Sequence, residues 1–274
     1  MRLLKTILVW FAVSVLCGCA SLPDTYVALE DSSTLGLNET LRRIENERVI
    51  FIGEAHTSGS DHLVQLAVIR HLHENGRKAA VALEVFPAWR QAVLDAWIGG
   101  RLSQYDFEME CNSIWNMLFW YYGDIFLYAR DNRIPLLGVN AEKSHLNSVA
   151  KNGPAAVSRE ELEKIGFISC GEDPVYEQVM RTAGERFVHE AELPYLCDAQ
   201  RLGDAVMAYN IADFLRRNDL TMVVLLGAAH ASKIGVPKML RNHLDAGSTV
   251  LLPDSFGSLT GREVGADLAD YIWY

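Results

Sequence analysis

Five short apolar segments recur along the chain, and each ends at or just before Gly, Glu, Asn or Pro. They cover residues 49–53, 79–84, 134–140, 222–227 and 249–252. Continuous apolar runs of this length, rich in β-branched residues, are typical of strands buried on both faces of a sheet. The pattern therefore predicts a central sheet.

Longer segments between these strands carry apolar residues every three or four positions, which is the spacing of a helix with one buried face. The clearest are 63–72, 89–97 and 202–214. Alternating strands and helices predict an α/β fold with a mostly parallel central sheet and helices on both faces. Residues 101–130 and 155–195 do not fit simple crossovers, and we expect them to be helical insertions that form a cap.

The composition is that of an ordinary globular protein, since 50% of the 274 residues are hydrophobic and 22% are charged. The chain has no internal repeat and no evident linker, so one domain is expected over 45–274. The formal net charge is −10, from 25 Lys and Arg against 35 Asp and Glu. A nucleic-acid partner is therefore not expected, because phosphate binding needs a basic surface.

The N-terminus has the pattern of a signal peptide over residues 1–18. Arg2 and Lys5 precede an apolar run that is too short to span a bilayer. The run ends in Leu-Cys-Gly-Cys, which resembles the lipobox of bacterial lipoproteins and makes Cys19 the expected lipidation site. Residues 19–44 would then be the lipidated N-terminus and a tether, since 20–40 show no periodic pattern. Ordinary secretion with cleavage nearby is the alternative.

Three cysteines follow Cys19 in the sequence: Cys111, Cys170 and Cys197. An oxidising compartment outside the cytoplasm would allow one disulfide among them. Our working hypothesis pairs Cys170 with Cys197.

Polar residues stand at the carboxyl ends of four predicted strands: Glu54 with His56, Glu84, Asn140, and His230. In an open parallel sheet all of these ends lie on one edge, which is where ligands bind. Histidine and glutamate are ligands for zinc, iron or manganese, and they also act as general acids and bases. Such residues also cap helices or pair with one another, but four of them on one edge favour a functional site.

Three further polar residues are candidates for the same site. His62 lies one turn into the helix after the first of these strands, and Gln200 and Asp204 share one helix face. Each has a simpler interpretation as an exposed residue. The motifs of nucleotide-binding loops and of serine nucleophiles are absent from the sequence, so those classes of enzyme are not expected.

Segments along most of the chain resemble the ChaN-like haem-binding uptake lipoproteins of the Tiki superfamily. The resemblance covers about residues 45–274 and is carried, in order, by 49–56, His62, Gln65, 83–86, Trp115, Trp120, Tyr122, 198–200, 204–208, 227–230, 235–237 and 269–273. It implies an iron-regulated lipoprotein of the bacterial outer membrane, facing the periplasm, which agrees with the lipobox-like sequence.

The resemblance also implies haem binding in envelope iron acquisition, with haem held between two protomers and a tyrosine on the iron. Tyr122, near the Trp-rich segment, is the first candidate because aromatic walls suit a porphyrin, and Tyr121 and Tyr195 follow. Packing between helices is the simpler role of this aromatic cluster. The other candidate residues for a haem site are His62, Asn140, Gln200 and Asp204.

Relatives in the wider superfamily, the Tiki proteases and the erythromycin-esterase-like enzymes, use similar Gly-x-x-His units with a further glutamate. The resemblance therefore implies an alternative function, a metal-dependent hydrolase or peptidase. The residues that would hold a divalent metal and carry out catalysis are Glu54, His56, Glu84 and His230. A scaffold without turnover is a third interpretation.

Overall fold

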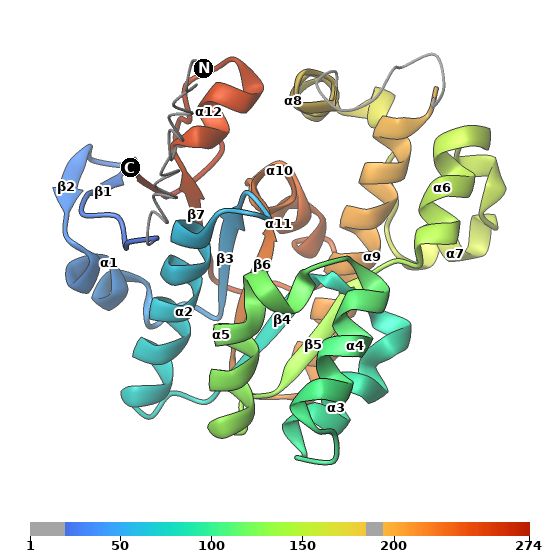
Figure 1. The fold of residues 1–274 in the computed structure, drawn as a ribbon. Helices are drawn as coiled ribbons and strands as arrows, with labels where there is room; N and C mark the ends of the chain where they lie inside the picture. Colours follow the sequence, from blue (N-terminus) through green and yellow to red (C-terminus); the bar gives the residue numbers. More distant parts are fainter. Residues whose placement is uncertain (1–19, 185–193) are drawn as a thin grey trace, which may run out of the picture.

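In the computed structural model, the described residues 20–184 and 194–274 contain a sheet of eight strands in the order β2-β1-β8-β7-β3-β6-β4-β5 (Figure 1). Strands β3 to β8 run parallel to one another, whereas β1 is antiparallel to both β8 and β2. The strands are β1 Tyr26–Ala28, β2 Ser33–Leu35, β3 Val49–Glu54, β4 Ala79–Pro87, β5 Leu136–Asn140, β6 Thr221–Gly227, β7 Ser248–Pro253 and β8 Tyr271–Trp273.

Helices cover both faces of the sheet (Figure 1). One face packs against α1 Leu37–Ile44, α2 Gly59–Glu74, α3 Gln91–Ile98, α4 Gln104–Ile114 and α5 Leu118–Asp131. The other packs against α6 Lys143–Asn152, α7 Arg159–Lys164, α8 Pro174–Gly184, α9 Leu196–Arg217, α10 Ala228–Ala231, α11 Val236–Leu240 and α12 Ser255–Thr260. Three single 3₁₀ turns are η1 Ala88–Arg90, η2 Pro154–Ala156 and η3 Cys170–Glu172.

The central strands are buried on both faces, which explains why their sequences do not alternate. In β3, the side chains of Ile50 and Ile52 belong to the core under α2, whereas Phe51 belongs to the core under α9. All three are fully buried. The predicted parallel α/β fold with helices on both faces is therefore confirmed.

The segments expected to be helical insertions are largely helical where the structure describes them. Residues 101–130 form α4 and most of α5, and α5 also contributes Ile125 and Phe126 to the core against the sheet. Within 155–184 the chain forms most of η2, then α7, η3 and α8.

The segment 20–40, predicted to be a tether, is instead partly folded onto the domain. Its strand β1 pairs with β8 at the C-terminal end of the chain, and α1 buries Leu41 and Ile44. The C-terminus accordingly lies close to β1 and β2 (Figure 1). The prediction was wrong because strands of three residues are too short to show a period.

The signal peptide 1–18 and the lipidation site Cys19 lie outside the described residues. Among the helices that the structure does describe, none is both long and apolar enough to cross a bilayer.

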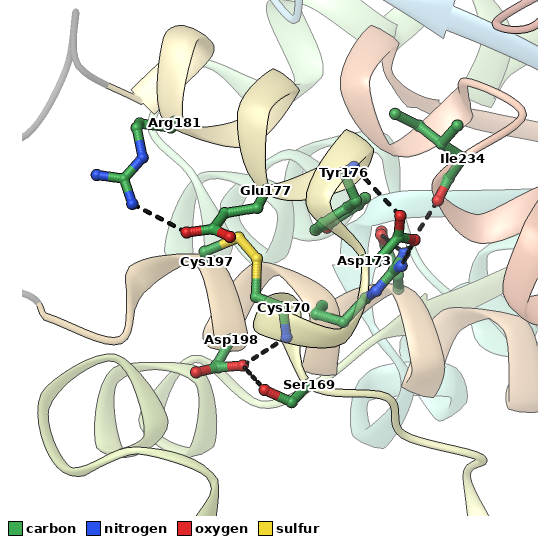
Figure 2. Close-up of a disulfide and its surroundings, with 11 residues drawn as sticks. Ser169, Cys170, Asp173, Tyr176, Glu177, Arg181, Cys197, Asp198 and Ile234 are labelled. Carbon is green, nitrogen blue, oxygen red and sulfur yellow. Dashed lines mark hydrogen bonds and ion pairs between the residues drawn. A yellow bond between two sulfur atoms is a disulfide. The ribbon is translucent and has the colours of Figure 1, made fainter.

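A disulfide between Cys170 and Cys197 joins η3 to the first turn of α9, as predicted from the sequence (Figure 2). The Cα atoms of the two residues are 5.9 Å apart. The adjacent Asp198 carboxylate accepts hydrogen bonds from the Ser169 hydroxyl and the Cys170 amide at 3.1 and 2.8 Å. The bond and these contacts fix the start of α9 against the segment that leads into α8.

Replacing both Cys170 and Cys197 by serine should lower the free energy of unfolding by roughly 3 kcal/mol, because the unfolded chain gains the freedom of an open loop. Urea unfolding of the variant and of the native chain measures this difference. A reductant should destabilise the native chain but not the double variant, and equal stability of the two proteins would contradict the prediction.

Candidate functional site

The register of the central strands brings the predicted polar residues to one edge of the sheet. Glu54 at the end of β3 pairs with Gly227 at the end of β6. On the other side of β6, Leu83 of β4 pairs with Leu225, so Glu84 follows at nearly the same level. Because β6 lies between β3 and β4, the two glutamates flank it. The predicted convergence at the carboxyl edge is confirmed.

Two glycines make room for this arrangement. A Cβ atom on Gly53 would lie 2.4 Å from Cδ2 of Leu252 and 2.9 Å from Cα of Ala228, so a side chain at this position would force the Ala228 backbone to move. A Cβ on Gly227 would lie 3.3 Å from Cε1 of His56. The glycine of each Gly-x-x-His unit therefore allows a close approach of chain segments at the site.

Glu54 is a buried carboxylate surrounded by hydrogen-bond donors. Its oxygens contact Nδ1 of His56 at 2.7 Å and Nδ1 of His62 at 3.3 Å, and they accept hydrogen bonds from the Gln65 amide and the Tyr122 hydroxyl. Burial alone would raise the pKa of Glu54, but the hydrogen bonds and charges of His56 and His62 lower it to about 2. Glu54 is therefore an anion at neutral pH.

The two histidines beside Glu54 differ in exposure. His62 is buried, and its Nε2 donates to the His56 carbonyl at 3.1 Å, so its interpretation as a solvated residue was wrong. His56 keeps 41% of its side chain exposed. Burial opposes protonation of each ring, yet the hydrogen bond with Glu54 and nearby carboxylate charge raise the pKa of both.

The loop between β3 and α2 is held by Asp61. Its carboxylate accepts a hydrogen bond from the Ala55 amide at 2.9 Å, and the Ser58 hydroxyl caps α2 by accepting from the Asp61 amide. Burial raises the pKa of Asp61. These contacts fix the turn that carries His56.

A second cluster is centred on His230. Its Nδ1 lies 2.5 Å from Oδ1 of Asp204, and its Nε2 lies 3.6 Å from Oε1 of Glu84. Burial disfavours the charged ring, but the charges of Glu84 and Asp204 raise the pKa of His230 to about 9. His230 is therefore an imidazolium between two carboxylates at neutral pH. Asp204 is fully buried against His230, so its interpretation as an exposed residue was wrong.

Charges continue from this cluster along α9, through residues that sequence reasoning missed. Arg201, one turn before Asp204, forms a buried ion pair with Asp173 and donates to the Ile234 carbonyl at 2.9 Å. Lys238 of α11 reaches the same Asp173 carboxylate at 2.6 Å. An arginine and an aspartate three residues apart in an otherwise apolar helix face are the signal that would have indicated this network.

A cavity of about 670 Å³ opens beside the two clusters. His56 and Glu84 contribute one side chain each from the strand ends, and η1, the end of α4 and the start of α6 provide the other walls. Trp115 holds its ring edge to face with His56, with centroids 5.9 Å apart. The residues that line the cavity are His56, Glu84, Val85, Pro87, Trp89, Arg90, Ser113, Ile114, Trp115, Asn140, Ala141, Glu142, Lys143, Ser144 and Leu146.

The tyrosine candidates do not line this cavity. Tyr122 is 1% exposed, and its hydroxyl is engaged by Glu54. Tyr121 stacks on Trp115 and faces a separate hollow of about 500 Å³ between α4 and α5. Tyr195, at the start of α9, is 42% exposed and packs against Gly153, which follows α6. The burial of Tyr122 disfavours it as a ligand for a group that enters from outside.

The remaining candidates occupy different positions. Asn140 lines the cavity, and its Oδ1 accepts a hydrogen bond from the Ala141 amide at 2.8 Å. Gln200 lies one turn before Asp204 and is half-buried.

The predicted metal-binding arrangement is not supported. Within residues 20–184 and 194–274, no group of three or more His, Cys, Asp or Glu side chains is placed to hold a metal ion. Glu54 is enclosed by hydrogen-bond donors, and both ring nitrogens of His230 face carboxylates. A metal-dependent hydrolase is therefore not favoured by the arrangement of these donors.

Comparison with known proteins gives a consistent picture. A sequence model of the family described as haem-binding uptake, Tiki superfamily, ChaN matches residues 40–240. The fold is similar to that of ChaN of Campylobacter jejuni, solved with cofacially bound haem, with a TM-score of 0.68 and 18% identity over 90% of this chain and 95% of the other. It is also similar to a variant of the erythromycin esterase EreC in its open conformation, with a TM-score of 0.50 and 14% identity over 84% and 76% of the two chains. No curated protein sequence matches the chain.

The charge of His230 predicts a pH dependence of stability. In the folded chain the pKa of His230 is about 9, above the ordinary value of 6.5. Its contribution to the free energy of unfolding is therefore complete below pH 6.5 and is lost as the pH rises to 9. The loss should reach about 3 kcal/mol in the free energy of unfolding. Urea unfolding across this range measures it for the native chain and for His230→Gln, which should lack most of the decline.

The exposed His145 on α6 supplies the control. His145→Gln should retain the decline of the native chain. A native chain whose stability is constant from pH 6.5 to 9 would contradict the assignment of an imidazolium at His230.

Proposed function

The chain belongs to the haem-binding uptake family of the Tiki superfamily typified by ChaN, and from this premise we propose that it binds haem in the cavity beside His56 and Glu84. The cavity is the observation that supports this proposal most directly. Its volume of about 670 Å³ lies within the range of pockets that hold cofactor-sized ligands.

The walls of the cavity suit the faces of a porphyrin. Apolar and aromatic side chains come from β4, η1, the end of α4 and α6, and they are Val85, Pro87, Trp89, Ile114, Trp115 and Leu146. Trp89 is mostly exposed, with the Arg90 guanidinium 5.0 Å from the centre of its ring. An apolar slot that is open on one side admits the macrocycle and leaves its polar edge in water.

Two cations on the cavity wall suit the propionate groups. Arg90 is held by the Glu110 carboxylate at 2.8 Å and the Ser113 hydroxyl at 2.7 Å. Lys143 begins α6, is exposed, and makes no ion pair within the part of the chain that the structure describes. Lys143 is therefore the free cation on this wall, whereas Arg90 is already oriented by its partners. Bound haem would supply the iron, and the chain supplies the slot and the charges.

The wider role proposed here is that of a lipoprotein in envelope iron acquisition. The Leu16-Cys17-Gly18-Cys19 sequence supports lipidation at Cys19, with the protein facing the periplasm from the outer membrane. The disulfide between Cys170 and Cys197 supports an oxidising location outside the cytoplasm.

The proposal includes a homodimer around haem. Large apolar side chains are exposed on α4 and around the start of α5, and exposed apolar surface of this kind is typical of interaction sites. They are Tyr105, Met109, Met117 and Trp120. Sedimentation of the full chain in detergent should show dimers when haemin is added, and a monomer with and without haemin would contradict the dimer.

Haem binding in this cavity is tested by reversing one charge on its wall. Titration of the full chain with haemin should produce a shifted Soret band, and Lys143→Glu should weaken binding about tenfold or more, because a charge-assisted hydrogen bond to a propionate is replaced by repulsion. Lys151→Glu is the matched control, since Lys151 is exposed near the far end of the same helix. No Soret shift in the native chain, or equal affinities of the two variants, would contradict the proposal.

A further inference from the structure

We propose that the carboxyl edge of the sheet, where the cavity opens, is docked on the bilayer that holds the lipid anchor. This inference rests on the lipidation of Cys19 in the proposed function and not on haem binding. It adds an orientation to that function, because the cavity then faces the lipid surface.

The topology of the sheet shows from which edge the chain enters the domain. Trp273 of β8 pairs with Pro253 at the carboxyl end of the parallel strand β7. β1 is antiparallel to β8, and its first residue, Tyr26, pairs with Trp273. The segment that leads into β1 therefore comes from the carboxyl edge of the sheet.

Ala20, the first residue that the structure describes, lies next to the candidate site. A Cβ atom on Gly59, the first residue of α2, would lie 2.8 Å from Cβ of Ala20. Gly59 follows His56 by three residues, which is at most about 10 Å of backbone. Because Cys19 immediately precedes Ala20, its Cα atom is only about 3.8 Å from that of Ala20.

This short connection limits the orientations of the domain. The segment 20–40 is partly folded onto the domain, so it does not act as a long tether. The acyl chains of an anchor have to enter the hydrocarbon of the bilayer. The surface around Ala20 must then lie at the headgroups, and this surface includes the start of α2 and the loop that carries His56.

Exposed side chains on this edge suit the boundary between headgroups and acyl chains. Leu22, two residues after Ala20, is 39% exposed, and Trp89 on the cavity wall is 63% exposed. Tryptophan is enriched at this boundary because one part of its ring is apolar and the other is polar. The formal net charge of −10 opposes attraction to anionic lipids. The anchor and the apolar side chains therefore supply the docking, and an amphipathic ligand dissolved in the bilayer reaches the cavity directly.

The test compares the two edges of the sheet in the full, lipidated chain. The protein is reconstituted in phosphatidylcholine vesicles in which part of the lipid carries a nitroxide on its headgroup, which quenches a dye only at short range. Thr57→Cys places the dye in the loop after β3, and Arg77→Cys places it at the opposite edge, where α2 leads into β4. Both positions are exposed. Cys111 is buried and the disulfide occupies two further cysteines, so the dye reacts with the introduced thiol.

The dye at Thr57→Cys should be quenched about threefold or more strongly than the dye at Arg77→Cys, because the 16 residues of α2 separate the two edges by about 24 Å. Inserting a linker of about twelve Gly and Ser residues between Ala20 and Ser21 should lower the quenching at Thr57→Cys to that at Arg77→Cys, since such a linker spans about 20 Å. The chain with the linker should still float with the vesicles.

Equal quenching at the two edges, or strong quenching at Thr57→Cys that persists with the linker, would overturn the docking and leave the lipid anchor in place. A chain that does not float with the vesicles would overturn lipidation and this inference together, whereas haem binding is decided separately by the haemin titration. Glu142→Cys and Lys78→Cys are a second exposed pair, one at each edge, and decide the question where a first variant fails to fold.

Discussion

The buried negative charge of Glu54 is the constraint on which the site depends. A carboxylate out of water costs several kcal/mol unless donors surround it. The structure supplies them from three elements: His56 follows β3, His62 and Gln65 lie on α2, and Tyr122 lies on α5. Because compensation of the charge needs all of these elements in place, Glu54 ties the first helical layer to the edge of the sheet.

A second set of buried charges ties the helices on the other face of the sheet to the same edge. Asp204 and Glu84 enclose His230, and Arg201, Asp173 and Lys238 continue the alternation of charges towards η3. The disulfide fixes η3 to α9 at the end of this series (Figure 2). One member of each set, His56 and Glu84, lines the cavity. The cavity thus lies where two charge-compensated clusters meet, and its shape depends on both.

The sequence predicts the fold and the site residues at the strand ends well, because the patterns that indicate them are local. Each central strand is a continuous apolar run, and a parallel sheet delivers all strand ends to one edge, so Glu54, His56, Glu84 and His230 could be assigned to it. The partners that complete the site were harder to identify. Whether Asp204 reaches His230 depends on how α9 packs against β6, and the burial of Tyr122 depends on how α5 packs against α2. Three-residue strands such as β1 leave no period to detect.

The most direct test of this account is the tautomer of His56 in the chain without haem. Two-dimensional ¹⁵N NMR of the histidine rings, recorded at a pH where the ring is neutral, distinguishes a proton on Nδ1 from a proton on Nε2. The account predicts that His56 carries its proton on Nδ1, where Glu54 accepts it, and that Nε2 is bare. A ring with its proton on Nε2 would contradict the orientation of His56 by Glu54.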